Sequence, residues 1–126
     1  MILVLDSSFV IDHLRGEPAA SDQWRRVFEN GDEPVATEVM VCEVRTGLRA
    51  ESESAFRAFL EPVEFVQPGP ETALTAGRWR AEARAAGRVL SLPDALIAAC
   101  AESLGATVLT RNVRDFALTP VRIETY

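Results

Sequence analysis

Four acidic residues of this chain stand beside or inside apolar runs, where a carboxylate adds little to stability. They are Asp6, Glu43, Asp94 and Asp115. Acidic side chains are rarely buried unless they are paired or bound to a metal ion. If the fold gathers these four, each pair repels by roughly 3–4 kcal/mol at about 4–5 Å and an effective dielectric constant near 20. Such a cluster predicts a cation site, since hard ions such as Mg²⁺ and Mn²⁺ take oxygen ligands.

Two of the four carboxylates lie in long expected helices. The neighbours of Glu43 at i±3 and i±4 are apolar or small, so no basic side chain on its own helix face neutralises it. Such a Glu either reaches solvent at the helix edge, pairs across the fold, or has a function. Asp94 ends the sequence Ser-Leu-Pro-Asp, which is typical of a capped helix start, and capping alone explains an Asp there. Asp12 has Arg15 three residues later and is interpreted as an ordinary charge.

The other two carboxylates follow expected strands. Asp6 comes directly after the first apolar run, and ligands of parallel sheets bind beyond the carboxyl ends of strands. Ser7 or Ser8 beside it is either a helix N-cap or a hydrogen-bond partner of the carboxylate or of a metal-bound water. Asp115 follows a later strand, and its ordinary interpretation is a surface ion pair with Arg111, which contributes little.

The spacing of apolar residues predicts an α/β fold. Strands are expected at 2–5, 34–36, 63–66, 107–110 and 121–124, and helices at 8–15, 18–30, 37–49, 51–61, 70–86, 92–104 and 113–117. This alternation indicates a mostly parallel central sheet of four to five strands, flanked by helices. No linker or repeat interrupts the pattern, so residues 1–126 are expected to form one domain.

The composition excludes several classes of protein. The chain is 48% hydrophobic and has no apolar run long enough to cross a membrane or serve as a signal peptide, so we expect neither disorder nor membrane association. Cys42 and Cys100 form no paired motif and are expected to be buried free thiols, as in a cytoplasmic protein. His13 has no catalytic partner nearby in the sequence and is expected to be an ordinary surface or core residue.

A net charge of −6 argues against a protein that coats nucleic acid by charge alone. It does not exclude a local basic track, and Arg80, Arg84 and Arg88 recur every four residues on one expected helical face. That stripe spans about 12 Å and suits a phosphate backbone. The alternative is a solvated helix surface.

The order of the acidic motifs resembles that of PIN-domain nucleases. The segment 110–116, Thr-Arg-Asn-Val-Arg-Asp-Phe, is similar to the C-terminal motif of that family, and the segments 93–99, 43–47 and 4–8 resemble its third, second and first acidic motifs. The resemblance covers essentially the whole chain, and this short form is most similar to the VapC-type toxins of bacterial toxin–antitoxin pairs. Asn112 departs from the pattern, because some family members carry Asp there.

This resemblance implies a PIN-like fold and a Mg²⁺- or Mn²⁺-dependent endoribonuclease. The implied metal ligands, direct or through water, are Asp6, Asp94, Glu43 and Asp115, with the first two as the principal ones. The side chains implied to orient them are Ser7, Thr110 and Asn112. The resemblance also implies a homodimer and a cognate antitoxin that blocks the acidic cleft. Two alternatives stay open, namely a PIN nuclease for RNA processing or DNA, and a degenerate module that binds partners without cleaving.

Overall fold

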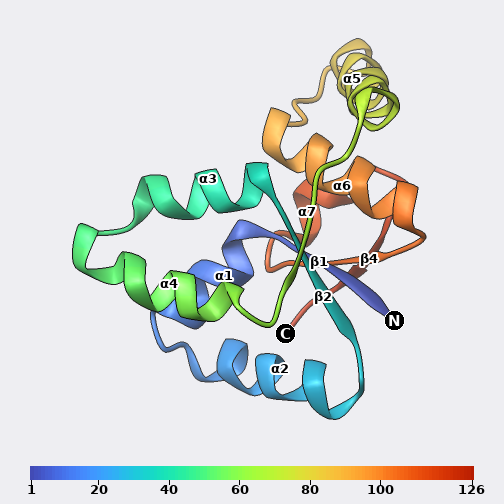
Figure 1. The fold of residues 1–126 in the computed structure, drawn as a ribbon. Helices are drawn as coiled ribbons and strands as arrows, with labels where there is room; N and C mark the ends of the chain where they lie inside the picture. Colours follow the sequence, from blue (N-terminus) through green and yellow to red (C-terminus); the bar gives the residue numbers. More distant parts are fainter.

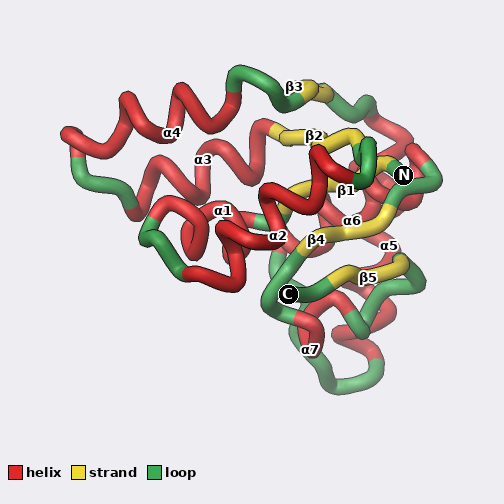
Figure 2. The backbone as a smooth tube through the Cα atoms, turned by 90° about the horizontal axis from the view of Figure 1, so that it is seen from below, coloured by secondary structure: helices red, strands yellow, loops and turns green.

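The computed structural model describes residues 1–126 around one five-stranded sheet (Figure 1). The strands are β1 (Ile2–Leu5), β2 (Glu33–Thr37), β3 (Glu64–Val66), β4 (Thr107–Leu109) and β5 (Arg122–Glu124). Their order is β3-β2-β1-β4-β5, as the tube in Figure 2 shows from below. Every neighbouring pair of strands is parallel. The predicted parallel α/β sheet is confirmed, with all five expected strands present.

Seven helices connect and cover the strands. They are α1 (Ser7–Leu14), α2 (Pro18–Glu29), α3 (Glu38–Gly47), α4 (Glu53–Leu60), α5 (Pro70–Ala85), α6 (Leu92–Leu104) and α7 (Val113–Phe116), with a 3₁₀ turn at Ala50–Ser52 before α4. Figure 1 shows α2 and α6 on opposite sides of the sheet, with α5 outside α6. The predicted helices are confirmed to within two residues at each end, which is the scatter expected of frayed helix ends.

The central strand carries the core. Leu3, Val4 and Leu5 are fully buried, because helices cover both faces of the sheet and each side chain therefore meets apolar neighbours. This explains why β1 reads as a continuous apolar run instead of an alternating one. Phe9 of α1 and Ile97 of α6 belong to the same core, so this packing anchors both helices to the sheet.

Local capping fixes where the helices near the carboxyl edge begin. The Thr37 hydroxyl accepts a hydrogen bond from the Met40 N–H at 3.2 Å, and the Ser91 hydroxyl accepts one from the Asp94 N–H at 3.2 Å. Each contact satisfies an N–H that the first turn of a helix leaves free. The caps therefore set the starts of α3 and α6, which carry Glu43 and Asp94 respectively.

Three expectations for single residues meet the structure differently. His13 was expected to be an ordinary surface or core residue, and it lies half-buried against the rings of Phe59 and Trp24. Cys100 is buried, but Cys42 is exposed, because it lies on the solvent side of α3; the expectation that both thiols are buried was wrong for Cys42. No helix is both long and apolar enough to span a membrane.

Candidate active site at the carboxyl edge of the sheet

The candidate site lies where the connections of the sheet diverge. From β1 the chain continues to β2 on one side, whereas β4 lies on the other side of β1 and continues to β5. Asp6 follows β1 directly, and its backbone N–H donates to the Leu109 carbonyl of β4 at 3.0 Å. A divergence of this kind leaves a crevice beyond the strand ends, which is where open α/β sheets bind ligands.

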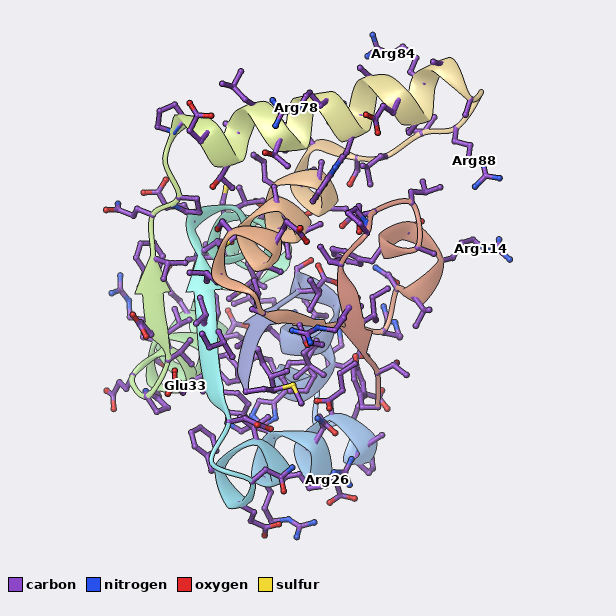
Figure 3. The ribbon with its side chains drawn as sticks, turned by 90° about the vertical axis from the view of Figure 1, so that its right-hand side faces the viewer. Arg26, Glu33, Arg78, Arg84, Arg88 and Arg114 are labelled. Atoms are coloured by element: carbon purple, nitrogen blue, oxygen red, sulfur yellow. The ribbon has the colours of Figure 1, made fainter.

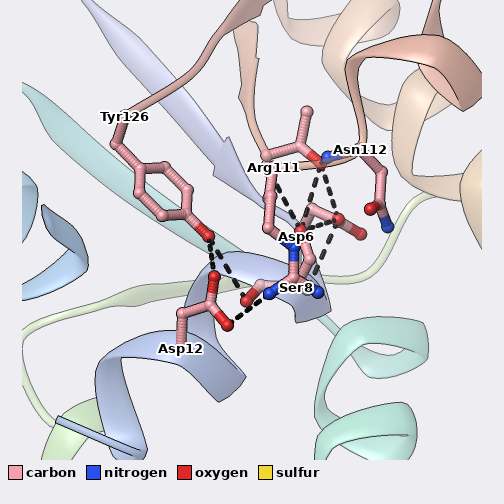
Figure 4. Close-up of polar contacts among 7 residues, drawn as sticks. Asp6, Ser8, Asp12, Arg111, Asn112 and Tyr126 are labelled. Atoms are coloured by element: carbon pink, nitrogen blue, oxygen red, sulfur yellow. Dashed lines mark hydrogen bonds and ion pairs between the residues drawn. The ribbon is translucent and has the colours of Figure 1, made fainter. Parts of the chain in front are cut away.

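Asp6 is 1% exposed and its two carboxylate oxygens differ sharply (Figure 4). Oδ2 accepts hydrogen bonds from the hydroxyls of Ser8 at 2.6 Å and Thr110 at 2.8 Å, and from the Ser8 N–H at 3.4 Å. Oδ1 is buried without any partner. A buried hydrogen-bond acceptor without a partner destabilises the fold by about 1–3 kcal/mol. A cation or a hydrogen-bond donor bound to Oδ1 would remove this cost.

The serine hydroxyl that contacts Asp6 belongs to Ser8. From the sequence, both Ser7 and Ser8 were considered as partners of Asp6, and the family resemblance implied Ser7. Asp6 is the N-cap of α1, and the N–H groups that face a capping carboxylate lie two or three residues beyond it. Ser8 therefore meets Asp6, whereas Ser7 lies near Glu43, where its hydroxyl acts on that carboxyl. The choice between Ser7 and Ser8 depends on the residue at which α1 starts, so it could not be made from the sequence.

Glu43 lies in the middle of α3 and is half-buried. Its Oε1 is buried without a hydrogen-bond partner. Burial raises the pKa of the Glu43 carboxyl above its usual range, the nearby Ser7 hydroxyl partly offsets this, and the charge of Asp6 raises it further. Glu43 thus has no counter-ion anywhere in the fold, and it faces another carboxylate.

Asp94 lies in the first turn of α6, and the pKa of its carboxyl is raised more than that of Glu43. Burial raises the pKa of Asp94 to about 6, against a partial offset from Ser91, and repulsion from Asp6, Asp115 and Glu43 adds to the rise. Ser91 does cap the helix at Asp94, but capping does not explain why Asp94 is partly buried beside three other carboxylates. Carboxylates from four separate segments act on one another at this edge of the sheet.

The carboxylate oxygens at this edge of the sheet suit a hard divalent cation as ligands. Carboxylate oxygens are the ligands that Mg²⁺ and Mn²⁺ prefer, and Asp6 and Glu43 each present a buried oxygen without a partner. As the side chains stand, no group of three or more acidic, histidine or cysteine residues is close enough to enclose an ion. An ion here therefore requires the less buried carboxylates, Glu43, Asp94 and Asp115, to move toward Asp6.

The segment after β4 contains the remaining predicted residues. Thr110 is fully buried and its hydroxyl also accepts from the Asn112 N–H at 2.8 Å, so Asn112 braces the residue that holds Asp6. Asp115 is exposed on α7. The ion pair considered between Arg111 and Asp115 is absent, because the Arg111 guanidinium donates to Asp12 at 2.5 Å.

Asp12 is the residue that the sequence interpretation missed. It is 5% exposed and is paired with Arg111, so treating it as an ordinary charge beside Arg15 was wrong. The partners of Asp12 are 99 and 114 residues away along the chain, at Arg111 and Tyr126. No local pattern could have revealed contacts at that separation.

Three predicted arginines gather beside the acidic site, though not on one helix. Arg80 and Arg84 belong to α5, whereas Arg88 lies beyond its end at Ala85, so the expected helical stripe was wrong for Arg88. They nevertheless line one hollow of about 170 Å³, whose members are Arg80, Arg84, Arg88, Val89 and Leu90. A neighbouring hollow of about 570 Å³ is lined by Arg88, Val89, Arg114, Asp115, Ala117 and Leu118.

The two hollows share Arg88 and Val89, and we refer to them together as the arginine groove. Figure 3 shows Arg88 and Arg114 extending from the same side of the molecule. The groove reaches Asp115, one of the four site carboxylates. Basic side chains thus lead to the edge of an acidic cluster.

Comparison with known proteins settles the family. The model of the PIN domain matches residues 3–120. The chain belongs to the PIN-domain family. It is also 35% identical over 117 residues to the ribonuclease VapC19 of Mycobacterium tuberculosis, covering 93% of this chain and 94% of that relative. The resemblance to PIN-domain nucleases of the VapC type is thereby confirmed.

Solved structures share the PIN fold over the whole chain. VapBC2 from Rickettsia felis, bound to a DNA fragment from its promoter, superposes with a TM-score of 0.87 at 20% identity and covers 100% of this chain and 99% of that one. VapBC-1 from nontypeable Haemophilus influenzae gives a TM-score of 0.83 at 26% identity, with 99% and 98% coverage. VapC20 of Mycobacterium tuberculosis, a sarcin-ricin loop cleaving toxin, gives 0.71 at 16%, with 94% and 95% coverage.

Proposed function

We propose that this PIN-domain protein is a Mg²⁺- or Mn²⁺-dependent endoribonuclease, and that it is the toxin of a toxin–antitoxin pair. The observation that carries the proposal is the gathering of Asp6, Glu43, Asp94 and Asp115 without a counter-ion: burial raises the pKa of Asp94 most, and repulsion from the other three carboxylates adds to the rise. A fold that keeps such a cluster without a counter-ion gains from it only when a cation binds. Similarity to the ribonuclease VapC19 supports hydrolysis of RNA as the reaction.

The proposed ligands differ in how tightly they are held. Asp6 is fixed by Ser8 and Thr110, which leave Oδ1 free to meet an ion. Asp94, at the start of α6, is the second principal ligand, and Glu43 and Asp115 complete the site directly or through water. A bound Mg²⁺ or Mn²⁺ ion would supply an activated water and offset negative charge on the phosphate being cut.

The arginine groove is the proposed path of the RNA backbone. Arg84, Arg88 and Arg114 are exposed and carry charge along a surface that ends at Asp115. Arg80 is half-buried, and its Nε donates to the Leu90 carbonyl at 3.0 Å, so it shapes the groove as well. Phosphates in this groove would reach the carboxylates along a neutralising track, which a protein of net charge −6 otherwise lacks.

The proposed partners are a cognate antitoxin and a second copy of the chain. Structural relatives include VapBC2 from Rickettsia felis and a toxin–antitoxin complex from Klebsiella pneumoniae, the latter with a TM-score of 0.78 over 94% of this chain and 92% of that one at 24% identity. An antitoxin segment that covers the carboxyl edge of the sheet would exclude RNA from the four carboxylates. Co-purification with the product of a short reading frame preceding this gene, and loss of cleavage in that complex, tests the partnership.

The nuclease activity is tested with structured RNA and single-stranded DNA in Mg²⁺, Mn²⁺ or EDTA. The wild type should cut RNA only when a metal ion is present, and Asp6→Asn and Asp94→Asn should each lower the rate at least about 10²-fold. The matched control is Asp22→Asn, since Asp22 is an exposed carboxylate that pairs with Arg25 on α2. Equal cleavage by all four proteins would refute the metal–carboxylate site.

The substrate arms of the same experiment separate the alternatives. Cleavage of DNA in preference to RNA would replace the toxin assignment with a PIN nuclease that acts on DNA. A protein that binds RNA or an antitoxin but cuts nothing in either metal would be a degenerate binding module.

A further inference from the structure

A buried carboxylate behind the site has two partners from distant segments. Asp12 lies one turn after Ser8 on α1, and the two therefore share a helix face. Its Oδ1 accepts from the Arg111 guanidinium at 2.5 Å, and its Oδ2 accepts from the Tyr126 hydroxyl at 2.6 Å. A carboxylate buried this deeply needs such donors, because its hydration is lost. Asp12 thus joins α1 to the segments that follow β4 and β5.

This contact continues into the acidic site through backbone atoms (Figure 4). The Arg111 N–H donates to Ser8 Oγ at 3.1 Å, and Ser8 Oγ donates to Asp6 Oδ2 at 2.6 Å. The Ser8 hydroxyl has one proton, which it donates to Asp6 because a carboxylate oxygen accepts, and its oxygen accepts from the Arg111 N–H. The Arg111 backbone thus helps to hold the Ser8 oxygen where its hydroxyl donates to Asp6, beside Thr110 Oγ1 at 3.2 Å.

The proton count at Asp6 explains why this direction matters. The hydroxyls of Ser8 and Thr110 both donate to Oδ2, and none reaches Oδ1. If the Ser8 hydroxyl turned away, only Thr110 and the longer contact from the Ser8 N–H would hold Oδ2, so the direction of the unpartnered oxygen would be less tightly fixed. Partners of this kind behind a metal ligand typically change metal affinity or activity by roughly 10–100-fold when they are removed.

We propose that Tyr126 is a positioning residue for this site: by fixing Asp12 and, through it, Arg111 and Ser8, it aims the free oxygen of Asp6 at the metal ion. Its ring packs edge-on against Phe9, with centroids 5.2 Å apart, so packing sets the place of the hydroxyl independently of the hydrogen bond. Burial, and then Asp12, raise the pKa of Tyr126, so its hydroxyl remains a donor over the working pH range.

The role of Tyr126 rests on the proposed metal-dependent nuclease function, and Tyr126→Phe tests it with the ring retained. The Arg111 amide should exchange its hydrogen faster in the metal-free variant, as followed by nuclear magnetic resonance. Mn²⁺ affinity measured by calorimetry should fall roughly 3–10-fold, a smaller loss than for a direct partner of the ligand. The catalytic rate constant kcat should fall by a similar factor, and the KM for RNA should stay unchanged because the arginine groove is intact.

A matched control separates positioning from stability. Gln23 is buried and donates to Glu124 of β5 at 2.9 Å, so Gln23→Ala loosens the same final strand without touching Asp12. Gln23→Ala should lower the midpoint of thermal unfolding but leave Mn²⁺ affinity and kcat unchanged in the folded protein. If Tyr126→Phe also leaves Mn²⁺ affinity, kcat and Arg111 exchange unchanged, while the wild type binds Mn²⁺ and cuts RNA, the positioning role is wrong and the nuclease proposal stands. A wild type that neither binds Mn²⁺ nor cuts RNA overturns both.

Discussion

Replacing Asp94 by Asn should stabilise the metal-free protein at neutral pH even though it removes a residue proposed to bind the metal. Asp94 is held beside three other carboxylates, and its ionisation is opposed by burial and by their charge. Asn has nearly the same shape and leaves the backbone contact from the Asp94 N–H to Ser91 in place. The change therefore removes repulsion with little loss of packing.

The size of the effect follows from the pKa of Asp94. A rise from 3.8 to about 6 corresponds to roughly 3 kcal/mol. Asp94 is partly exposed, so solvent screening reduces this to about 1.5 kcal/mol. Losing a charge in the first turn of α6 costs about 0.5 kcal/mol through the helix dipole. The net stabilisation is about 1 kcal/mol, or about 4 °C in unfolding midpoint for a chain of this length.

The sign of the pH dependence makes the prediction sharp. The folded protein holds the Asp94 proton more tightly than the unfolded chain, so the wild type is most stable, as far as this group matters, below pH 3.8 and loses that contribution as the pH rises through about 6. Asp94→Asn should therefore match the wild type near pH 4 and exceed it by the full amount above about pH 7.

Urea denaturation in EDTA at a series of pH values measures this difference, and the difference between the two proteins cancels the titration of other groups. Added Mg²⁺ should reverse the order, because it stabilises the wild type by mass action and Asp94→Asn much less. The matched control is again Asp22→Asn, which should show no gain at any pH. An Asp94→Asn variant that is less stable than the wild type at pH 8 without metal would refute the reasoning.

Three further changes test other parts of the structure. Thr110→Val removes a buried hydroxyl that donates to the site and accepts from the loop after it, so the free energy of unfolding in urea should fall by about 2–3 kcal/mol. Arg88→Gln and Arg114→Gln should each raise the KM for RNA and each reduce the slope of log affinity against log salt by about 0.7, as measured by binding titrations in a salt series. Cys42 should react with a thiol reagent in the native protein whereas Cys100 should not, because it is buried and its thiol has a pKa of about 11.

Each of these has a clear contrary outcome. The control for the arginine groove is Arg25→Gln, since Arg25 lies on α2 and is paired with Asp22 and Glu29. An equal change in salt slope for Arg25→Gln would mean that the groove has no special part in RNA binding. Two reactive thiols before unfolding would contradict the burial of Cys100, and unchanged stability in Thr110→Val would contradict its role as a buried donor.

The sequence by itself determined the helices and strands, and the edge of the sheet at which Asp6 lies. Apolar runs such as residues 2–5 predict strands because both faces of a parallel sheet must be covered, and capping patterns such as Ser91 to Asp94 predict helix starts. These are local effects, and they are visible without any partner. The same holds for Asp6, which must lie at the carboxyl edge once a parallel sheet is accepted.

Only the tertiary structure decided how those residues meet. Ser8 contacts Asp6 because α1 starts directly after Asp6, at Ser7. The Asp6 carboxylate has one bonded and one free oxygen because the hydroxyls of Ser8 on α1 and of Thr110, just after β4, both donate to the same oxygen. Asp12 is a buried junction because its partners arrive from segments about a hundred residues away. Contacts at that separation form when the strands pair, so no spacing along the chain records them.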